Sequence, residues 1–153
     1  MTPHSSPTKA LDVMMLPKIF TPDIAPSPRF SLDEIGDCFF TGGAAGGYGI
    51  TLKAEYGRSF ILGILNSKLC KWFISQTSPP MRGGWLSFES RFIKHIPIQT
   101  GSEAQETAVI ERVEQILADP RGTSVTQLTA EIDQLIYEIY ELTPGEIAVI
   151  EGA

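Results

Sequence analysis

The sequence has few of the residues that would indicate a disulfide framework or a metal centre. It contains two cysteines, Cys38 and Cys70, and two histidines, His4 and His95, and neither pair has metal-ligand spacing. No cationic start followed by an apolar run marks a signal peptide, so we expect reduced thiols. Apolar stretches such as 60–65 are far shorter than a membrane span. These absences predict a cytoplasmic protein that makes no membrane contact.

Motifs for nucleotide binding and catalysis are also missing. The sequence has no G-x-x-x-x-G-K phosphate loop and no G-x-G-x-x-G after a predicted strand. The glycines of 42–47 lack the spacing and the following helix that would hold a pyrophosphate. We interpret His95 as an ordinary loop or strand residue, and the carboxylates from Glu103 to Glu114 as the solvent face of a helix. We therefore predict no catalytic residue, cofactor site or metal ligand in this chain, and an independent hydrolase is the least favoured class.

The chain as a whole carries a net negative charge, which disfavours binding to a polyanion. Its formal charge is −6, which is not typical of a nucleic-acid-binding protein. However, residues 1–100 hold ten Lys/Arg and seven Asp/Glu, whereas 101–153 hold two and eleven. The stretch 53–94 alone has seven cations and two anions. Because charges separated by more than a Debye length, ~8 Å, are largely screened, a basic middle can bind an anion beside an acidic tail.

The residue pattern predicts an α+β fold. Strands are predicted at 18–20, 29–33, 38–40 and 48–52, with the glycine-rich stretch between the last two as the tip of a long hairpin. Apolar residues at helical spacing predict a single helix over 58–74, in which Gly63 indicates a close backbone contact.

The tail is predicted to be an acidic helical hairpin with well-capped helices. Three capping boxes mark helix starts, each with a hydroxyl followed three residues later by Gln or Glu: Ser102/Gln105, Ser124/Gln127 and Thr143/Glu146. Pro144 occupies the first position of the last predicted helix.

The stretch 53–94 has features of a binding surface. Arg82 is followed by Gly83-Gly84, which lets a guanidinium approach a phosphate or a guanine closely. Trp85 is as consistent with stacking on a base as with a place in the core. Arg91 and Lys94 share a face if that piece is helical. Each cation alone is more often a solvated surface charge, but their concentration favours binding.

These residues also carry a resemblance to a known family. The run FILGILNSK at 60–68, then Arg82-Gly83-Gly84 and FIKHIPI at 92–98, resembles the TaqI-like C-terminal specificity domain. This is the target recognition domain of type II restriction–modification enzymes that methylate adenine N6. KIFTPDI at 18–24, RFSLD at 29–33 and IDQLIYEIYELT at 132–143 are similar to further parts of the family, so the resemblance extends over roughly 16–151.

The resemblance implies that catalysis belongs to another domain. In the family, a separate Rossmann-like methyltransferase domain binds S-adenosylmethionine and flips the target adenine with an Asn-Pro-Pro-Tyr type motif. This chain has Ser78-Pro79-Pro80-Met81, which lacks both the leading Asn/Asp and the trailing aromatic residue. We therefore expect no cofactor in this chain and S-adenosylmethionine on a partner methyltransferase domain or subunit.

Two functions follow as hypotheses. The first is a sequence-specific recognition module for double-stranded DNA, with an extended or disordered segment at 1–16, a DNA target recognition domain at 17–100 and a C-terminal helical subdomain at 101–153. The alternative is a protein-interaction subunit that docks through its acidic helical tail, and both can hold together. The predicted DNA-binding residues are Gly46, Gly47, Tyr48, Lys53, Lys68, Lys71, Arg82, Gly83, Gly84, Trp85, Ser87, Arg91 and Lys94. Among them we expect Arg82, Ser87 and Arg91 to contact bases, and the lysines to contact phosphates.

Overall fold

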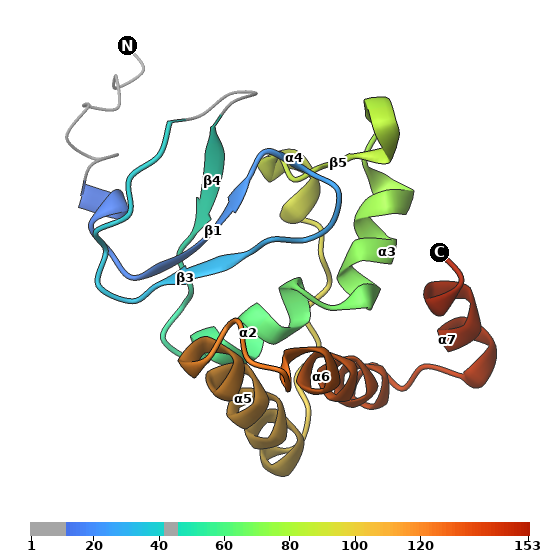
Figure 1. Ribbon diagram of the computed structural model, residues 1–153. Coiled ribbons are helices and arrows are strands. Elements are labelled where there is room, and N and C mark those ends of the chain that lie inside the picture. The colour runs from blue at the N-terminus through green and yellow to red at the C-terminus, as the bar shows by residue number, and fades with distance from the viewer. Residues whose placement is uncertain (1–11, 42–45) are drawn as a thin grey trace.

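The computed structural model describes residues 12–41 and 46–153, and it has the predicted α+β architecture (Figure 1). Short antiparallel strands form one side of the molecule, and helices cover the other. Most of the predicted segment 1–16 lies outside the described residues. Within the described part, no helix combines the length and apolar character needed to cross a membrane.

The larger sheet is built around strand β1 (Lys18–Pro22). Its neighbours are β3 (Ser31–Asp33) and β4 (Gly47–Ile50), both antiparallel to it, so the strand order is β3-β1-β4. Three of the four predicted strands are therefore confirmed. The predicted strand at 38–40 is wrong, because the Asp33 carboxylate accepts the Cys38 backbone N–H at 3.1 Å and draws the segment away from sheet geometry. Of the predicted hairpin tip, residues 42–45 lie outside the described part.

A second, two-stranded sheet joins distant parts of the chain. Strand β2 (Ile24–Ala25) pairs antiparallel with β5 (Leu86–Ser87). Both strands have only two residues, which is too short for an alternating pattern to indicate them. This sheet was therefore not among the predicted elements.

The helix predicted over 58–74 is two helices, and this prediction is corrected. Helix α2 (Arg58–Leu65) ends at Asn66, and α3 (Lys68–Thr77) begins after Ser67. The Ser67 hydroxyl accepts the Cys70 N–H at 3.2 Å, which caps α3. Asn66 uses its side chain elsewhere: its oxygen accepts the Phe30 N–H and its nitrogen donates to the Phe30 carbonyl, both at 2.9 Å. The apolar periodicity continues through the break, which is why the pattern reads as one helix.

Short elements follow α3 before the helical tail. A 3-10 turn, η1 (Arg82–Gly84), leads into β5, and helix α4 (Ser90–Ile93) follows it. The tail contains α5 (Glu103–Ala118), α6 (Val125–Ile139) and α7 (Pro144–Glu151), with α5 and α6 packed side by side (Figure 1).

Two of the three predicted capping boxes are confirmed. The boxes that begin at Ser102 and Thr143 form completely, and Pro144 opens α7. The box at Ser124 is wrong, because Ser124 has helical angles (φ −82°, ψ −10°) instead of the extended ones that a cap needs. The side chain of Gln127 donates to Glu131 at 2.9 Å instead.

One hydrophobic cluster connects the strands to α2, α3, α5 and α6. It runs from Ile19 and Phe30 through α2 to Val109 and Ile136, so it crosses residue 100. Gly63 makes the predicted close contact, since a Cβ placed there would lie 2.7 Å from Cγ1 of Val109. The division into subdomains at residue 100 stays a prediction.

Gly63→Ala tests this close approach of α2 to α5. Alanine gains about 1 kcal/mol of helix propensity, but the new methyl group must displace Val109 and Val113, which costs roughly 1–3 kcal/mol of overpacking. We expect a net loss of about 1 kcal/mol in the free energy of unfolding, measured by urea denaturation. Gly145→Ala is the matched control, because no atom lies within 4 Å of a Cβ at that position. Equal stability gains in both variants would contradict the close contact.

Asn66→Ala tests the link between the helices and the strands. The change removes both hydrogen bonds to the Phe30 backbone and leaves a part-buried N–H and C=O without partners. We expect a loss of roughly 1–3 kcal/mol in the free energy of unfolding. Gln99→Ala removes only an exposed bond to the neighbouring Thr100, and it should change stability by less than about 0.5 kcal/mol. Similar urea midpoints for the two variants would contradict this role of Asn66.

Candidate nucleic-acid interface

Ten of the thirteen predicted DNA-binding residues separate into three groups in the structure, and the other three, Arg82, Gly83 and Trp85, lie in the loop around η1. One group gathers where the two sheets meet, a second lines a depression beside α3 and α7, and a third lines an apolar groove beside β4. The first group contains Gly46, Gly47, Tyr48, Ser87 and Arg91; the second Lys68, Lys71 and Gly84; the third Lys53 and Lys94.

Asp23 holds the first group together through its backbone. Its N–H donates to the Gly46 carbonyl at 3.1 Å, and its carbonyl accepts the Phe88 N–H at 2.7 Å. It therefore connects the start of β4 to the end of β5, which lie with α4 along the upper edge of the molecule in Figure 1. We call this site the Asp23 junction; it comprises Asp23, Gly46, Gly47, Tyr48, Ser87, Glu89 and Arg91. Asp23 and Glu89 were not among the predicted DNA-binding residues.

The Asp23 side chain has unused hydrogen-bonding capacity. Only 6% of the residue is exposed, and its Oδ1 is buried without a hydrogen-bond partner among the described residues. Burial, followed by the nearby charge of Glu89, raises the pKa of Asp23, while Arg91 opposes the shift. Burial, together with Asp23 and Glu89, also raises the pKa of Tyr48, so the tyrosine keeps its O–H as a donor. The junction thus contains an unsatisfied buried acceptor and a neutral tyrosine hydroxyl.

Glu89 fixes the orientation of Arg91. The guanidinium makes a two-pronged contact with the carboxylate: Nη2 to Oε1 at 3.1 Å and Nε to Oε2 at 2.9 Å. It also stacks over the Phe92 ring, with Cζ 4.8 Å from the ring centroid. The Arg91 side chain remains 64% exposed. The structure therefore presents a positioned guanidinium whose charge is balanced locally.

The loop 82–85 carries Arg82, which is the predicted base-contacting residue that lies outside the Asp23 junction. Gly83 and Gly84 have φ values of 78° and 76°, which L-residues with side chains adopt only with strain. The turn is closed by the Met81 N–H, which donates to the Trp85 carbonyl at 3.2 Å. Arg82 is exposed, and Trp85 is 45% exposed, so Trp85 is not a core residue. Since β5 begins directly after Trp85, this loop is joined to the Asp23 junction by one short strand.

Helix α7 neutralises one of the predicted phosphate contacts. Lys68 Nζ lies 2.5 Å from Oε2 of Glu151, and the Tyr137 hydroxyl donates to Oε1 of the same carboxylate at 2.8 Å. The hydrogen bond from Lys68 lowers the pKa of Glu151, and the carboxylate raises the pKa of Lys68. Lys71, one turn further along α3, is exposed and lines the same depression.

Lys53 and Lys94 lie far apart in the sequence but line the same groove. The groove is mainly apolar, with walls from the end of β4, α2 and the stretch 93–98. Both lysines are exposed. Because Lys94 ends α4 and Arg91 lies within it, this group adjoins the Asp23 junction along the chain.

Another carboxylate, Asp33, is fully used by the fold. It forms a buried ion pair with Lys18 and accepts backbone N–H groups from Gly36, Asp37 and Cys38. These contacts, the Lys18 bond foremost, hold the pKa of Asp33 well below its usual value. Ligand atoms of Asp33, Asp37 and Cys38 lie within 4.8 Å of one another. Because Asp33 already accepts four donors, we interpret this group as structural.

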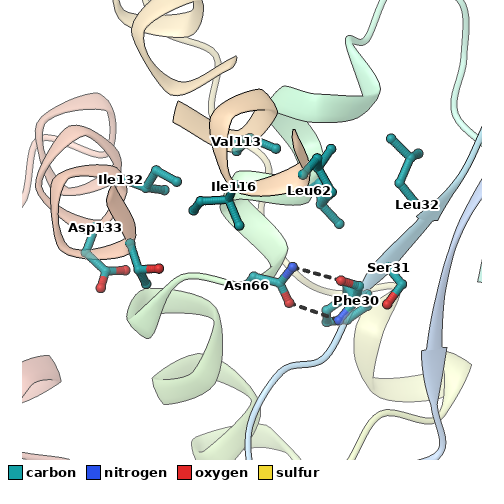
Figure 2. Close-up of a pocket in the computed structure, with 12 residues that line it drawn as sticks. Phe30, Ser31, Leu32, Leu62, Asn66, Val113, Ile116, Ile132 and Asp133 are labelled. Atoms are coloured by element: carbon teal, nitrogen blue, oxygen red, sulfur yellow. Dashed lines mark hydrogen bonds between the residues drawn. The ribbon is translucent and has the colours of Figure 1, made fainter. Parts of the chain in front are cut away.

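A cavity of about 380 Å³ lies between α2, α5, α6 and β3 (Figure 2). Its walls are mainly apolar, and both polar atoms of Asn66 at its edge are bonded to Phe30. Asp133, at another edge, accepts the Lys68 backbone N–H at 2.9 Å. None of the predicted DNA-binding residues lines this cavity. The other carboxylate oxygen of Asp133, Oδ2, is buried without a hydrogen-bond partner among the described residues.

Together the fold and the site define a class of protein: a small α+β domain that presents arginines, lysines and hydrogen-bonding side chains from short strands and loops. A model of the TaqI-like C-terminal specificity domain matches residues 2–98. The chain belongs to this family, which confirms the resemblance and places it among the DNA specificity domains of restriction–modification methyltransferases. The similarity proposed at 132–143 lies outside the matched residues. Comparison with curated proteins gave no match.

Replacing Asp33 or Asp23 by asparagine should have opposite effects on the thermal stability of the domain. Asp33→Asn leaves the buried Lys18 without its counter-charge, so we expect a lower thermal midpoint at pH 7. Asp23→Asn removes a charge that burial disfavours, so its midpoint should equal or exceed that of the wild type.

Acid should reduce both differences. The stabilisation from Asp33 is complete above the unfolded pKa of about 3.9, and it is lost as the pH falls toward the depressed folded pKa. The penalty from Asp23 is complete above its raised folded pKa and disappears below the unfolded value. Thermal melts from pH 7 down to pH 3 measure both trends. A lower midpoint for Asp23→Asn than for Asp33→Asn would contradict these assignments.

Proposed function

We propose that this chain is the DNA-recognition part of a type II restriction–modification adenine-N6 methyltransferase and that it reads double-stranded DNA without catalysing methyl transfer. Its membership of the specificity-domain family carries the proposal. The position of the Asp23 junction supports it, because the start of β4 and the end of β5 meet there through the Asp23 backbone. Sequence readers need such positioned donors and acceptors at base edges.

The exposed arginines and lysines suit two different kinds of DNA contact. Arg82 and Arg91 have the planar, multiple donors suited to guanine, and they lie in η1 and α4, the elements that flank β5 in the sequence. Lys53, Lys71 and Lys94 are exposed and lie outside the Asp23 junction, so they suit phosphate contacts that hold the domain in register.

We propose that methyl transfer and S-adenosylmethionine binding belong to a partner methyltransferase domain or subunit. The pair Pro79-Pro80 supports this division, because Ser78 and Met81 stand where a catalytic motif would need an amide or carboxylate and an aromatic ring. Both prolines directly follow the end of α3 and are exposed. Their position suits a helix stop better than a base-flipping site.

A salt titration tests the phosphate contacts. Binding of a labelled random-sequence duplex is measured between about 50 and 200 mM salt, the range over which phosphate contacts dominate the change in affinity. Lys71→Ala and Lys94→Ala should each weaken binding and reduce the salt slope by about one. Lys68→Ala should have a smaller effect, because Glu151 already compensates that charge. Arg121→Ala, an exposed arginine in the turn between α5 and α6, is the matched control.

The proposal fails if the wild-type chain binds no duplex at about 50 mM salt, alone or with its methyltransferase. It is also contradicted if Arg121→Ala changes the salt slope as much as Lys71→Ala and Lys94→Ala do. Either outcome would favour a role in which the acidic tail binds another protein.

A further inference from the structure

We propose that helix α7 is an autoinhibitory element, in which the carboxylate of Glu151 occupies a position on Lys68 that a DNA phosphate would otherwise take. This inference rests on the proposed function and adds regulation to it. Because a phosphate contact carries no sequence information, the contact with α7 lowers the affinity for duplexes of every sequence alike.

Two donors from different helices converge on the Glu151 carboxylate. Lys68 Nζ, on α3, lies 2.5 Å from Oε2, and the hydroxyl of Tyr137, on α6, donates to Oε1 at 2.8 Å. Lysines and tyrosine hydroxyls are also donors that bind the phosphate oxygens of DNA. The position that Glu151 fills is therefore an anion site, and the chain's own carboxylate competes there with an external phosphate.

This position is open to a ligand from solvent. The side chains of Lys68 and Glu151 are 50% and 36% exposed. Both line a depression of about 250 Å³, and the charged side chains among its lining residues are Lys68, Lys71 and Glu151. Gly84 also lines it, so the depression adjoins the loop that carries Arg82. Without the charge of Glu151, this depression would present two cations to the duplex beside a predicted base contact.

The ion pair has little importance for the fold. Glu151 is the last residue of α7, and the buried residue of that helix is its neighbour Ile150. An exposed ion pair contributes little to stability, because solvent screens it and both side chains lose freedom. A structural role therefore does not account for a carboxylate at this place, whereas competition for Lys68 does.

The inhibiting carboxylate comes from the acidic tail. Lys68 lies within the residues that the family model matches, whereas Tyr137 and Glu151 lie beyond them. Figure 1 shows α7 beside α3. Another ion pair of the tail, Arg112 with Glu131, joins α5 to α6 and involves no predicted DNA-binding residue. In the described part of the chain, the acidic tail thus forms its ion pair with the basic stretch at Lys68.

Removal of the charge on Glu151 tests the inhibition. Binding of a labelled random-sequence duplex by the full chain, with its methyltransferase if binding requires it, is measured from about 50 to 200 mM salt. Glu151→Gln should bind more tightly at the lower salt, and its salt slope should steepen by about one. The ratio of the affinities at the two salt concentrations then rises roughly three- to fourfold. Glu138→Gln, an exposed glutamate on α6, is the matched control and should leave the slope unchanged.

A double-mutant cycle separates this contact from a general effect of charge. Lys68→Ala should change the salt slope little in the wild type, because Glu151 already compensates its charge. In the Glu151→Gln background the same substitution should lower the slope by about one. Thermal melts check that each variant is folded, and Glu151→Ala replaces Glu151→Gln if the glutamine variant does not fold.

Two results would overturn the inference while the proposed function stands. One is an equal change of slope in Glu151→Gln and Glu138→Gln, and the other is an equal effect of Lys68→Ala in both backgrounds, with Lys71→Ala still lowering the slope in each case. If neither the wild type nor Glu151→Gln binds a duplex, the proposed function itself fails, and this inference fails with it.

Discussion

The arrangement of this domain depends on the interruption of the central apolar helix at Asn66 and Ser67. If the helix continued, α3 would extend along the axis of α2 and carry the following loop away from the strands. Instead, the Asn66 side chain bonds to the Phe30 backbone, which precedes β3. The Asp133 carboxylate of α6 accepts the first N–H of α3. One break thereby fixes the strands, α3 and the helical tail relative to one another, and β5 reaches β2.

The pairing of β2 and β5 has a cost in chain entropy that other contacts must offset. Residues about sixty positions apart meet over only two residues on each side, which alone would not hold them. The core supplies the rest, since Phe30 and Phe88 pack edge to face with centroids 5.7 Å apart, and Phe88 is fully buried. Packing next to the short sheet therefore stabilises the geometry of the Asp23 junction. Binding residues can then sit at the ends of strands that are too short to be stable alone.

The sequence predicts elements that repeat a pattern and misses those that depend on a single contact. The strands at β1, β3 and β4, the capping boxes at Ser102 and Thr143, and the role of Gly63 all follow from local rules. The helix break, the β2–β5 pair and the loss of a strand at 38–40 follow from long-range or side-chain bonds that periodicity does not record. For the same reason, five residues of the Asp23 junction were predicted from their type, whereas Asp23 and Glu89 were not. A single carboxylate has no sequence signal that distinguishes a DNA-contacting residue from a structural one.

The negative net charge of the chain is consistent with reading DNA once affinity and specificity are separated. Phosphate contacts supply affinity without sequence information, and they need only a few exposed cations on one side of the domain. Specificity in the major groove requires acceptors as well as donors, so carboxylates at the reading edge are useful instead of harmful. The partly exposed carboxylate beside the predicted base contacts is neutralised by its neighbour, since Glu89 pairs with Arg91. The Asp23 carboxylate is buried instead, and this burial is the main cause of its raised pKa. The net charge of the whole chain therefore does not decide whether one of its faces binds DNA.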